Sequence, residues 1–337
     1  MAPDSTVSTS KCEVKTEKNG TVKENHKNVP NRKNNNPHYG KYKFIRWEFE
    51  TPLIWRNIIA IFTLHILAVY VLLTHTDVYY LHPGIVIYVL VRIQPINCII
   101  TSNYRIFFLQ NSLLDWVRDH RVHHKFTETN ADPHNIKRGF FFAHVGWLMM
   151  RKHPDVIRMG KALDYSDLFV DPLVVFHQKY FIWLKLLFCF ILPTMIPPLL
   201  WGESLILTIK AIAIVRYTLS LNFTWLVNSA AHLWGTKPYD KKIDPVQNLT
   251  VSVVAMGEGY HNYHHTFPWD YRASEMGSSL NITTLWLNFF EKIGWAYDLK
   301  SPSQELVKKV VTTHGDGTHY KWGHEVPYKT SADCKSL

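Results

Sequence analysis

Four apolar stretches of the chain are candidates for membrane spans. Residues 53–73, 182–200 and 205–227 are mostly apolar, and only a short polar segment separates the last two. A helix of about 20 apolar residues crosses a bilayer. The stretch at residues 84–100 starts apolar, but an arginine, a glutamine, a proline and an asparagine interrupt it after residue 91. Because an arginine inside a span costs about 2.5–3.5 kcal/mol, this second span is the least favourable of the four.

The segments that connect these spans differ in charge. Residues 74–83 and 201–204 contain no Lys or Arg, whereas the N-terminal segment, residues 105–181 and the region after Leu233 are rich in both. Loops rich in Lys and Arg stay on the cytosolic side of a membrane. The pattern therefore predicts a multi-pass protein with both termini and the large loop in the cytosol.

The two ends of the chain are polar. Residues 1–40 are rich in Lys, Asn, Ser and Glu, which predicts a disordered tail and not a signal peptide. Residues 301–337 form a second polar tail. Residues 41–300 then make up an all-α integral membrane domain, with four transmembrane helices and a helical cytosolic part. Apolar side chains at helical spacing over residues 282–293 predict either an interfacial helix or one packed on the cytosolic part.

Composition and charge limit the classes of molecule that the protein could bind. A net charge of +10 suits nucleic acid, an anionic membrane surface or an anionic substrate. The sequence has no nucleic-acid-binding motif, which leaves membrane lipid and an anionic substrate. Aromatic residues make up 14% of the chain, which suits a membrane–water boundary. The four cysteines are scattered and indicate neither a disulfide framework nor a zinc site.

Two histidine clusters share one spacing. Their members occur at positions i, i+3 and i+4: His120, His123 and His124 in the first, and His261, His264 and His265 in the second. On a helix, side chains with this spacing project from one face, so each cluster can reach one or two metal ions. Imidazole suits iron, zinc, copper or nickel, so the spacing alone does not choose the metal.

Other histidines differ in their setting. Asn228 and His232 share a helix face at the cytosolic end of the fourth span, and beside the two clusters we interpret His232 as a further ligand. His134 is expected to orient ligands through hydrogen bonds. The rest are interpreted as packing or interfacial residues (His65, His75 and His82) or as solvated residues of the C-terminal tail (His314, His319 and His324).

Four segments resemble the signature segments of the membrane acyl-CoA desaturases of animals, with similarity to insect members. The segments are residues 116–125 (WVRDHRVHHK), 139–147 (GFFFAHVGW), 222–232 (NFTWLVNSAAH) and 257–271 (GEGYHNYHHTFPWDY). The resemblance covers about residues 40–300, apart from one break.

The break lies between about residues 91 and 108. Here the family carries its first histidine group, a His-x-x-x-x-His on the cytosolic extension of the second span. This chain has no histidine between His82 and His120, and the segment is shorter than the family pattern. A faulty gene model, a skipped exon or a decayed paralogue would each produce such a break.

The resemblance implies a di-iron site. In this family, histidines and one asparagine acting through water hold two iron ions (Fe²⁺). The corresponding ligands here are His120, His123, His124, His232, His261, His264 and His265, with Asn228 acting through water. Two ligands of the missing group have no counterpart, so we expect the chain as written to be inactive or nearly so.

The resemblance also implies the reaction and its partners. The family uses O₂ to introduce a cis double bond into a saturated fatty acyl-CoA, usually at carbon nine (the stearoyl-CoA or delta-9 type). NADH supplies the electrons through NADH-cytochrome b5 reductase and cytochrome b5, in the endoplasmic reticulum membrane. The positions matching coenzyme A contacts are Asn57, Asn111, Arg118, Arg151 and Lys152, and those matching the acyl tunnel are Trp116 and Trp225.

Three other functions compete with this interpretation. The first is an inactive desaturase-like protein that binds acyl-CoA or a partner desaturase. The second is another membrane di-iron enzyme, such as a hydroxylase, although residues 222–232 and 257–271 favour a desaturase. The third is a transporter, which would keep polar groups near the bilayer midplane, whereas these histidines lie at the cytosolic edge.

Overall fold

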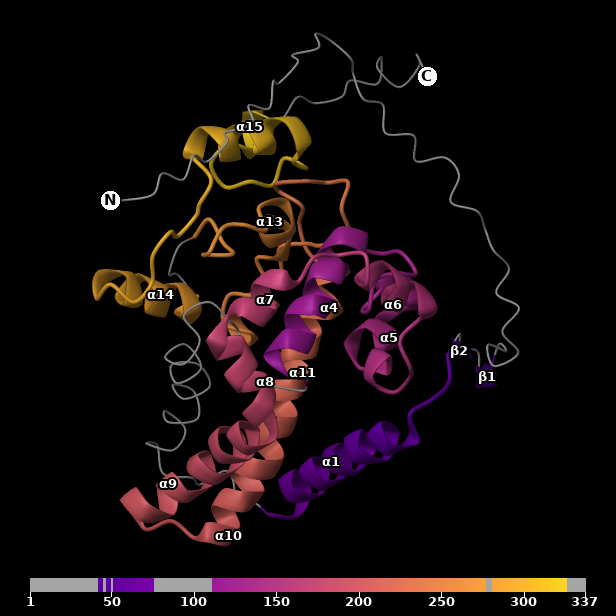
Figure 1. The fold of residues 1–337 in the computed structure, drawn as a ribbon, viewed down its shortest axis with the longest axis vertical. Helices are drawn as coiled ribbons and strands as arrows, with labels where there is room; N and C mark the ends of the chain where they lie inside the picture. The colour runs from indigo at the N-terminus through magenta and orange to yellow at the C-terminus, as the bar shows by residue number, and fades with distance from the viewer. Residues whose placement is uncertain (1–41, 45–46, 50, 76–110, 277–280, 326–337) are drawn as a thin grey trace, which may run out of the picture. The chain divides into compact units, whose positions relative to one another are not determined.

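The computed structural model describes residues 42–44, 47–49, 51–75, 111–276 and 281–325 (Figure 1). Helices dominate these residues, and a short antiparallel hairpin of β1 (Tyr42–Phe44) and β2 (Trp47–Phe49) precedes the first of them. The predicted tail at residues 1–40, the second span at 84–100 with the break after residue 91, and residues 326–337 lie outside the described residues.

Within the described residues, three helical stretches are long and apolar enough to cross a membrane. They are α1 (Trp55–Thr74) and the continuous stretches Pro172–Trp201 and Leu205–His232. These match the first, third and fourth predicted spans, with different boundaries for the last two. A fourth transmembrane helix remains a prediction.

The third span begins ten residues before its predicted start at residue 182. It consists of α8 (Pro172–Lys185), a π-helical segment η4 (Leu186–Ile191) and α9 (Leu192–Trp201). Asp171 caps it by accepting hydrogen bonds from the backbone of the first turn, and Pro172 favours that turn. Hydropathy missed this start because His177 and the two polar residues after it lie inside the helix.

A proline inside the third span helps to account for an arginine inside the fourth. Pro193 has no N–H to donate to the carbonyl of Cys189, four residues earlier. Instead, Arg216 Nη2 donates to the Cys189 oxygen at 2.7 Å, while its Nε donates to the Ile212 oxygen at 3.1 Å. The arginine therefore satisfies backbone acceptors within the spanning pair.

The fourth span is longer than the predicted 205–227. It is built of α10 (Leu205–Thr208), the π-helical η5 (Ile209–Arg216), α11 (Tyr217–Asn228) and a 3₁₀ turn η6 (Ala230–His232). Val71 of α1 packs with Ala211, Ile212 and Val215 of η5 in a buried cluster. Since the helical stretch ends at His232, the fold places this histidine at the end of a span.

The other helices of the described residues are shorter. They are α4 (Leu113–Phe126), η2 (Ile136–Arg138), α5 (Phe140–His144), η3 (Gly146–Leu148), α6 (Pro154–Gly160), α7 (Ser166–Val170), α12 (Leu249–Val254), α13 (His261–Thr266), α14 (Ile282–Lys292), α15 (Gln304–His314) and η7 (Gly323–Glu325). In Figure 1 the α9–α10 hairpin lies at one end of the spanning pair, and α13 and α15 lie beyond the other.

Part of the predicted C-terminal tail is folded. Val307 and Val311 of α15 are buried in one cluster with Tyr239, Tyr263 and Phe267. The predicted polar tail therefore contains a docked helix, whose Val307 and Val311 lie about one helical turn apart, with the partly buried Val310 between them. Tyr263 lies on α13 between two of the predicted ligands, so α15 packs against the metal-binding helix.

His319 is likewise not solvated, contrary to the prediction. It is 6% exposed, and its Nε2 lies 2.8 Å from a Glu275 carboxylate oxygen. Tyr239 donates its hydroxyl to the same carboxylate at 2.8 Å. Burial alone would raise the pKa of Glu275, but the hydrogen bonds from His319 and Tyr239 outweigh it and lower the pKa below 4.5.

This carboxylate should stabilise the fold in a pH-dependent way. Because its pKa is lower in the folded state, its contribution is present above the unfolded pKa and is lost as the pH falls through the folded one. We expect Glu275→Gln to cost about 1–3 kcal/mol at pH 7, and the difference in melting temperature from wild type to shrink as the pH falls below 4.5. The exposed Glu291→Gln is the matched control, and an equal effect from it would contradict this role.

Helix α14 combines features of both alternatives predicted for it. Leu287 and Phe290 are buried, whereas Leu285, Phe289 and Ile293 are 56%, 47% and 44% exposed. One face therefore packs on the unit and the opposite face presents apolar side chains. Contact of that face with a membrane stays a prediction.

Candidate metal centre

Helix α4 presents the first histidine cluster. Ser112 caps the helix by accepting a hydrogen bond from the Asp115 backbone, which fixes where the helix starts. The following residues are helical through Phe126, so His120, His123 and His124 lie on neighbouring turns, as the spacing predicts.

Helix α13 presents the second cluster, and Asn262 holds it in place. The side-chain oxygen of Asn262 accepts hydrogen bonds from the Tyr239 and Asp240 backbone, and its amide donates to the Asp240 and Pro245 carbonyls. The residue is fully buried. Gly259, just before the helix, approaches α12 so closely that a Cβ would lie 2.2 Å from the Asn248 carbonyl oxygen. The short helix is therefore fixed at both its start and its first turn.

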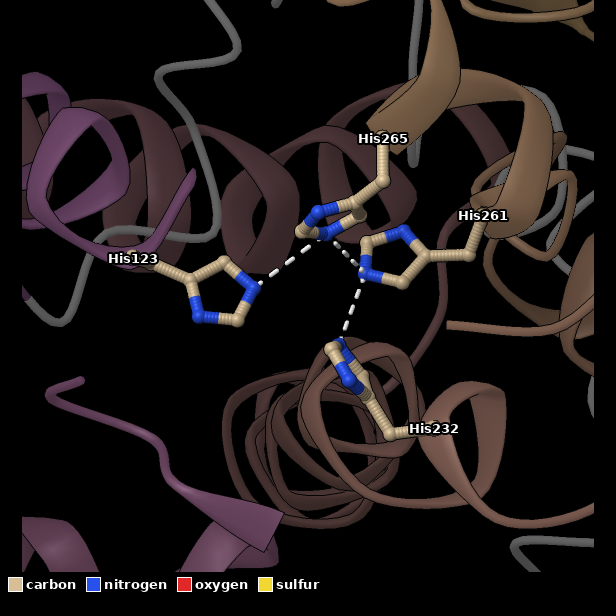
Figure 2. Close-up of side chains that lie close together, drawn as sticks. All are labelled: His123, His232, His261 and His265. Atoms are coloured by element: carbon tan, nitrogen blue, oxygen red, sulfur yellow. Dashed lines mark hydrogen bonds between the residues drawn. The ribbon is translucent and has the colours of Figure 1, made fainter. Parts of the chain in front are cut away.

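The seven predicted histidines converge in two groups. His123, His232, His261 and His265 form the first group, here called the four-histidine group, and Figure 2 shows their rings facing a common centre. His120, His124 and His264 form the second, the three-histidine group. In each group one ring nitrogen per residue lies within 4.8 Å of all the others.

Within both groups the facing atoms are Nε2 nitrogens. In the four-histidine group the Nε2–Nε2 distances are 3.3 Å for His123–His265, 3.1 Å for His265–His261 and 3.0 Å for His261–His232. In the three-histidine group the three distances are 3.0, 3.1 and 3.2 Å. Two nitrogens bound to one metal at about 2.0–2.1 Å lie at similar separations, so the spacing fits a shared ion in each group.

A carboxylate fixes the orientation of one ligand. Asp132 Oδ1 lies 2.8 Å from His123 Nδ1, and both residues are buried. Burial alone would raise the pKa of Asp132, but His123 lowers it to about 2. The ionised carboxylate accepts a hydrogen bond from the Nδ1–H of His123, which leaves the His123 Nε2 lone pair facing the other imidazoles.

The second acid near the ligands is Glu128. Its Oε1 lies 3.4 Å from His232 Nδ1. Burial, followed by the neighbouring Asp244 carboxyl, raises the pKa of Glu128 to about 8. Glu128 adopts a left-handed backbone conformation with φ of 63°, which an L-residue rarely adopts. The chain is thus strained at the residue that turns this carboxyl toward His232.

The charge state of the imidazoles also suits a metal. Burial lowers the pKa of His261 and His265 well below 6.5, and each is lowered further by neighbouring histidines. The rings are therefore neutral near pH 7, which is the form that binds metal. Three or four imidazole nitrogens that face one another at about 3 Å cannot all pair through N–H···N hydrogen bonds, and a cation between them removes the repulsion of their lone pairs. The residues present therefore fit metal ions in both groups.

Two further residues were predicted near the centre, His134 and Asn228. His134 was expected to orient a ligand, but Asp132 forms that hydrogen bond. The Nδ1 of His134 is buried without a partner, and the His134 backbone N–H donates to Asp132. Asn228 ends α11, four residues before His232, and its contact through water remains a prediction.

The residues predicted to bind coenzyme A differ in their contacts and exposure. Arg118 and Lys152 converge on Asp119, at 3.4 Å and 2.6 Å, and Arg151 next to Lys152 is exposed. Asn57 donates its amide to the Leu148 carbonyl at 2.7 Å, and so links α1 to η3. Asn111 lies directly before the cap of α4.

The two predicted tunnel residues lie close to other functional side chains. Trp116 stacks on His120 with ring centroids 4.6 Å apart. Trp225 is 2% exposed and lies between the rings of His65 and His144, at 6.0 Å and 5.6 Å. The side chain of Asn222 forms hydrogen bonds with both of these histidines and so links α1, α5 and α11.

Sequence reasoning missed three acidic residues around the site: Asp119, Glu128 and Asp132. A signal for Asp132 was present, because carboxylates often orient metal-binding histidines and this one follows His123 by nine residues in the same polar segment. Its loop geometry, however, could not be read from spacing. Asp119 directly precedes His120 on α4, and its pairing with Lys152 depends on a distant segment of the chain, just before α6.

Within the described residues, three helices are long and apolar enough to cross a membrane, and two groups of imidazoles lie at the end of one of them. These features define an integral membrane protein with a histidine-rich candidate metal centre. The chain belongs to the fatty acid desaturase family, because the sequence model described as "Fatty acid desaturase" matches residues 96–274.

Individual relatives agree with this assignment. The chain is 44% identical over 300 residues to the Acyl-CoA Delta-9 desaturase of Acheta domesticus, covering 82% of this chain and 83% of the relative. It is 55% identical over 217 residues to the Acyl-CoA Delta(11) desaturase of Spodoptera littoralis, covering 64% of each. It is 45% identical over 285 residues to Acyl-CoA desaturase 3 of Mus musculus, covering 79% of each.

Proposed function

We propose that this protein is an acyl-CoA desaturase that introduces a cis double bond at carbon nine of a saturated fatty acyl-CoA. The observation that carries the proposal is the convergence of seven histidine Nε2 atoms in two adjoining groups at the end of a span. Two iron ions held there would supply the activation of O₂ that removes hydrogen from an unactivated methylene pair, chemistry for which side chains have no equivalent.

The assignment to carbon nine is more specific than the assignment to the desaturase family. Relatives include a delta-9, a delta-11 and a delta-12 desaturase. The delta-9 relative from Acheta domesticus matches over 300 residues at 44% identity, whereas the delta-11 relative matches over 217 residues at 55% identity. This broader match supports the delta-9 choice.

The chain's own residues have separate tasks in this proposal. The basic side chains of Arg118, Arg151 and Lys152 attract the coenzyme A phosphates, and arginine can form paired hydrogen bonds to them. Trp116, stacked on His120, and Trp225 line the path of the acyl tail. Asp132 holds His123 in the tautomer that binds metal.

Arg151 offers the clearest test of head-group binding because it is exposed. We expect Arg151→Ala to weaken acyl-CoA binding by roughly 10–100-fold, since charge-assisted hydrogen bonds contribute about 1.5–3 kcal/mol, and the loss to shrink at high salt. The measurement is equilibrium binding of a fluorescent acyl-CoA to the purified protein. Lys161→Ala, an exposed basic residue at the end of α6, is the control, and equal affinities of wild type and Arg151→Ala would remove Arg151 from the site.

The proposal includes the setting of the enzyme. The protein lies in the endoplasmic reticulum membrane with both termini and the metal centre in the cytosol, where cytochrome b5 and its NADH-dependent reductase deliver electrons. Two loops without Lys or Arg support this orientation, at residues 74–83 and 201–204. We expect glycosylation tags at either terminus to stay unmodified in microsomes. Glycosylation of a C-terminal tag would contradict the four-span topology.

One observation favours a second candidate, a catalytically inactive relative that binds acyl-CoA or a partner desaturase. The sequence has no histidine between His82 and His120, where the family carries its first histidine group. An enzyme with an incomplete ligand set can keep substrate binding while losing catalysis.

Fatty-acid analysis of a desaturase-deficient yeast tests both candidates. The yeast carries either the chain as written or a version with a His-x-x-x-x-His segment restored after residue 91. A double bond at carbon nine in the restored strain supports the proposed function, and its appearance with the chain as written excludes the inactive candidate. Double bonds at another carbon would refute the delta-9 assignment, and no new double bond from either version would refute desaturation.

A further inference from the structure

A chain of hydrogen bonds joins the first span, the short helix α5 and the end of the fourth span. His65 Nδ1 lies 2.8 Å from the Ile61 carbonyl oxygen within α1, and His65 Nε2 lies 3.0 Å from the Asn222 amide nitrogen. The Asn222 side-chain oxygen lies 3.3 Å from His144 Nε2, and His144 Nδ1 lies 2.9 Å from the Ser229 hydroxyl oxygen. Polar side chains are costly within a membrane span, so those found there commonly have a function.

Two backbone carbonyls fix the direction of these bonds. A carbonyl oxygen can only accept, so His65 Nδ1 donates to Ile61. The Asn222 amide nitrogen donates to the Thr218 carbonyl at 2.8 Å, and the same nitrogen donates to the lone pair of His65 Nε2. The Asn222 side-chain oxygen then faces His144, and because this oxygen accepts, His144 Nε2 carries the donated proton.

His144 therefore accepts a hydrogen bond from Ser229. Burial lowers the pKa of His144 below 6.5, so its ring is neutral near pH 7 and, with the proton on Nε2, has a lone pair on Nδ1. Phe140 stacks on this ring with centroids 5.2 Å apart, and Trp225 contacts it edge-on at 5.6 Å, so packing holds the ring in place. The fully buried Ser229 hydroxyl lies between His144 and the Trp225 carbonyl oxygen, which is 3.0 Å away.

Ser229 is the residue at which the fourth span changes its helix type. Helix α11 ends at Asn228, and the Ser229 N–H donates to the Leu226 carbonyl, three residues earlier, at 3.3 Å. The Ser229 carbonyl accepts from the His232 N–H at 3.1 Å and so begins the 3₁₀ turn that carries this ligand. If the α-helix continued instead, the His232 side chain would be rotated by about 60° and displaced by about 1.5 Å.

A displacement of this size would take His232 out of the four-histidine group. Its Nε2 lies 3.0 Å from His261 Nε2, and metal–ligand distances tolerate deviations of only about 0.2 Å. We infer that His144 is a positioning residue for the metal centre: acting through Ser229, it holds the helix break that brings His232 to the four-histidine group. This inference rests on the proposed metal-binding function of that group.

Two substitutions of His144 separate its two hydrogen bonds. The side-chain oxygen of asparagine takes the place of the histidine Nδ1 and can accept from Ser229, whereas the amide nitrogen of glutamine takes the place of Nε2 and can donate to Asn222. His144→Asn therefore keeps the bond to Ser229, and His144→Gln loses it. Ser229→Ala removes the same bond from the other side. His314→Ala, at an exposed histidine outside both histidine groups, is the control.

The test is titration of the purified, metal-stripped full-length protein with Co²⁺ alone, whose visible absorption reports entry into a nitrogen site. Circular dichroism establishes that each variant is folded. We expect His144→Gln and Ser229→Ala each to weaken one Co²⁺ binding step by about 10–100-fold and to change the absorption spectrum. The double variant should lose no more than either single variant, because both remove one interaction. His144→Asn and His314→Ala should match wild type in affinity and spectrum.

If His144→Gln does not fold, Ser229→Ala decides alone. Wild-type Co²⁺ binding by folded His144→Gln or Ser229→Ala would overturn the inference while leaving the metal centre in place. A loss in His144→Asn as large as that in His144→Gln would overturn it as well, because the bond to Ser229 would then not be the one that matters. No Co²⁺ binding by folded wild type would overturn the metal centre itself.

Discussion

Restoring a His-x-x-x-x-His segment after residue 91 is expected to raise desaturation by more than about 100-fold over the chain as written. Loss of a supporting residue outside the ligand shell commonly costs about 10–100-fold in metal affinity or activity, and loss of two ligands should cost more. Within the described residues, four imidazoles form one group and three form the other.

The comparison has a matched control. A third version carries an insert of the same length with alanine in place of both histidines. It separates the effect of the ligands from that of the restored chain length. Each version is expressed at equal level in a desaturase-deficient yeast, and monounsaturated fatty acids are measured. Robust product from the chain as written would show that seven histidines suffice, and product from the alanine insert equal to that from the histidine insert would show that length alone was missing.

Replacing Val311 by aspartate should have the largest effect on stability of any single change considered. Val311 is fully buried and packs with Tyr239, Tyr263 and Phe267. A buried charge without a partner costs about 3–5 kcal/mol. Tyr263 lies on α13 between His261 and His264, so release of α15 should also loosen the helix that carries three of the seven ligands.

Two readouts check this prediction: the melting temperature of the purified protein and its retained metal. Both should fall in Val311→Asp. Thr313→Asp introduces the same charge two residues later on an exposed position in the last turn of α15, and should lower the stability by less than about 1 kcal/mol without loss of metal. If Val311→Asp melted like Thr313→Asp, the packing of α15 on the metal-binding helix would be refuted.

The sequence predicted the spanning helices well where composition is uniform. The first span was placed within two residues of α1, because apolar residues dominate the whole length of this helix. The third was placed ten residues short, because the helix begins at the Asp171 cap and passes through polar residues before the apolar run. Hydropathy measures the buried length in lipid, whereas helix boundaries follow local capping.

The sequence predicted the histidines of the site, but not the residues that hold them in place. All seven predicted histidines fall into the two groups. Six of them have the i, i+3 and i+4 spacing that places three side chains on one face of each helix before any tertiary contact is known, and His232 was predicted from its place at the end of the fourth span. Asp132 and Asn262 support the ligands through loops, whose course the spacing does not determine. The docking of α15 was missed because the few apolar residues that carry it, chiefly Val307 and Val311, lie in a polar segment.

The most direct test of the account is X-ray absorption at the metal edge of the purified protein, expressed with iron supplied. The account predicts a first shell of nitrogen donors, with the multiple-scattering pattern of three to four imidazole rings per metal. Protein folded but free of metal, or metal with fewer than two imidazoles in its shell, would contradict the claim that these histidines form the metal centre of a desaturase.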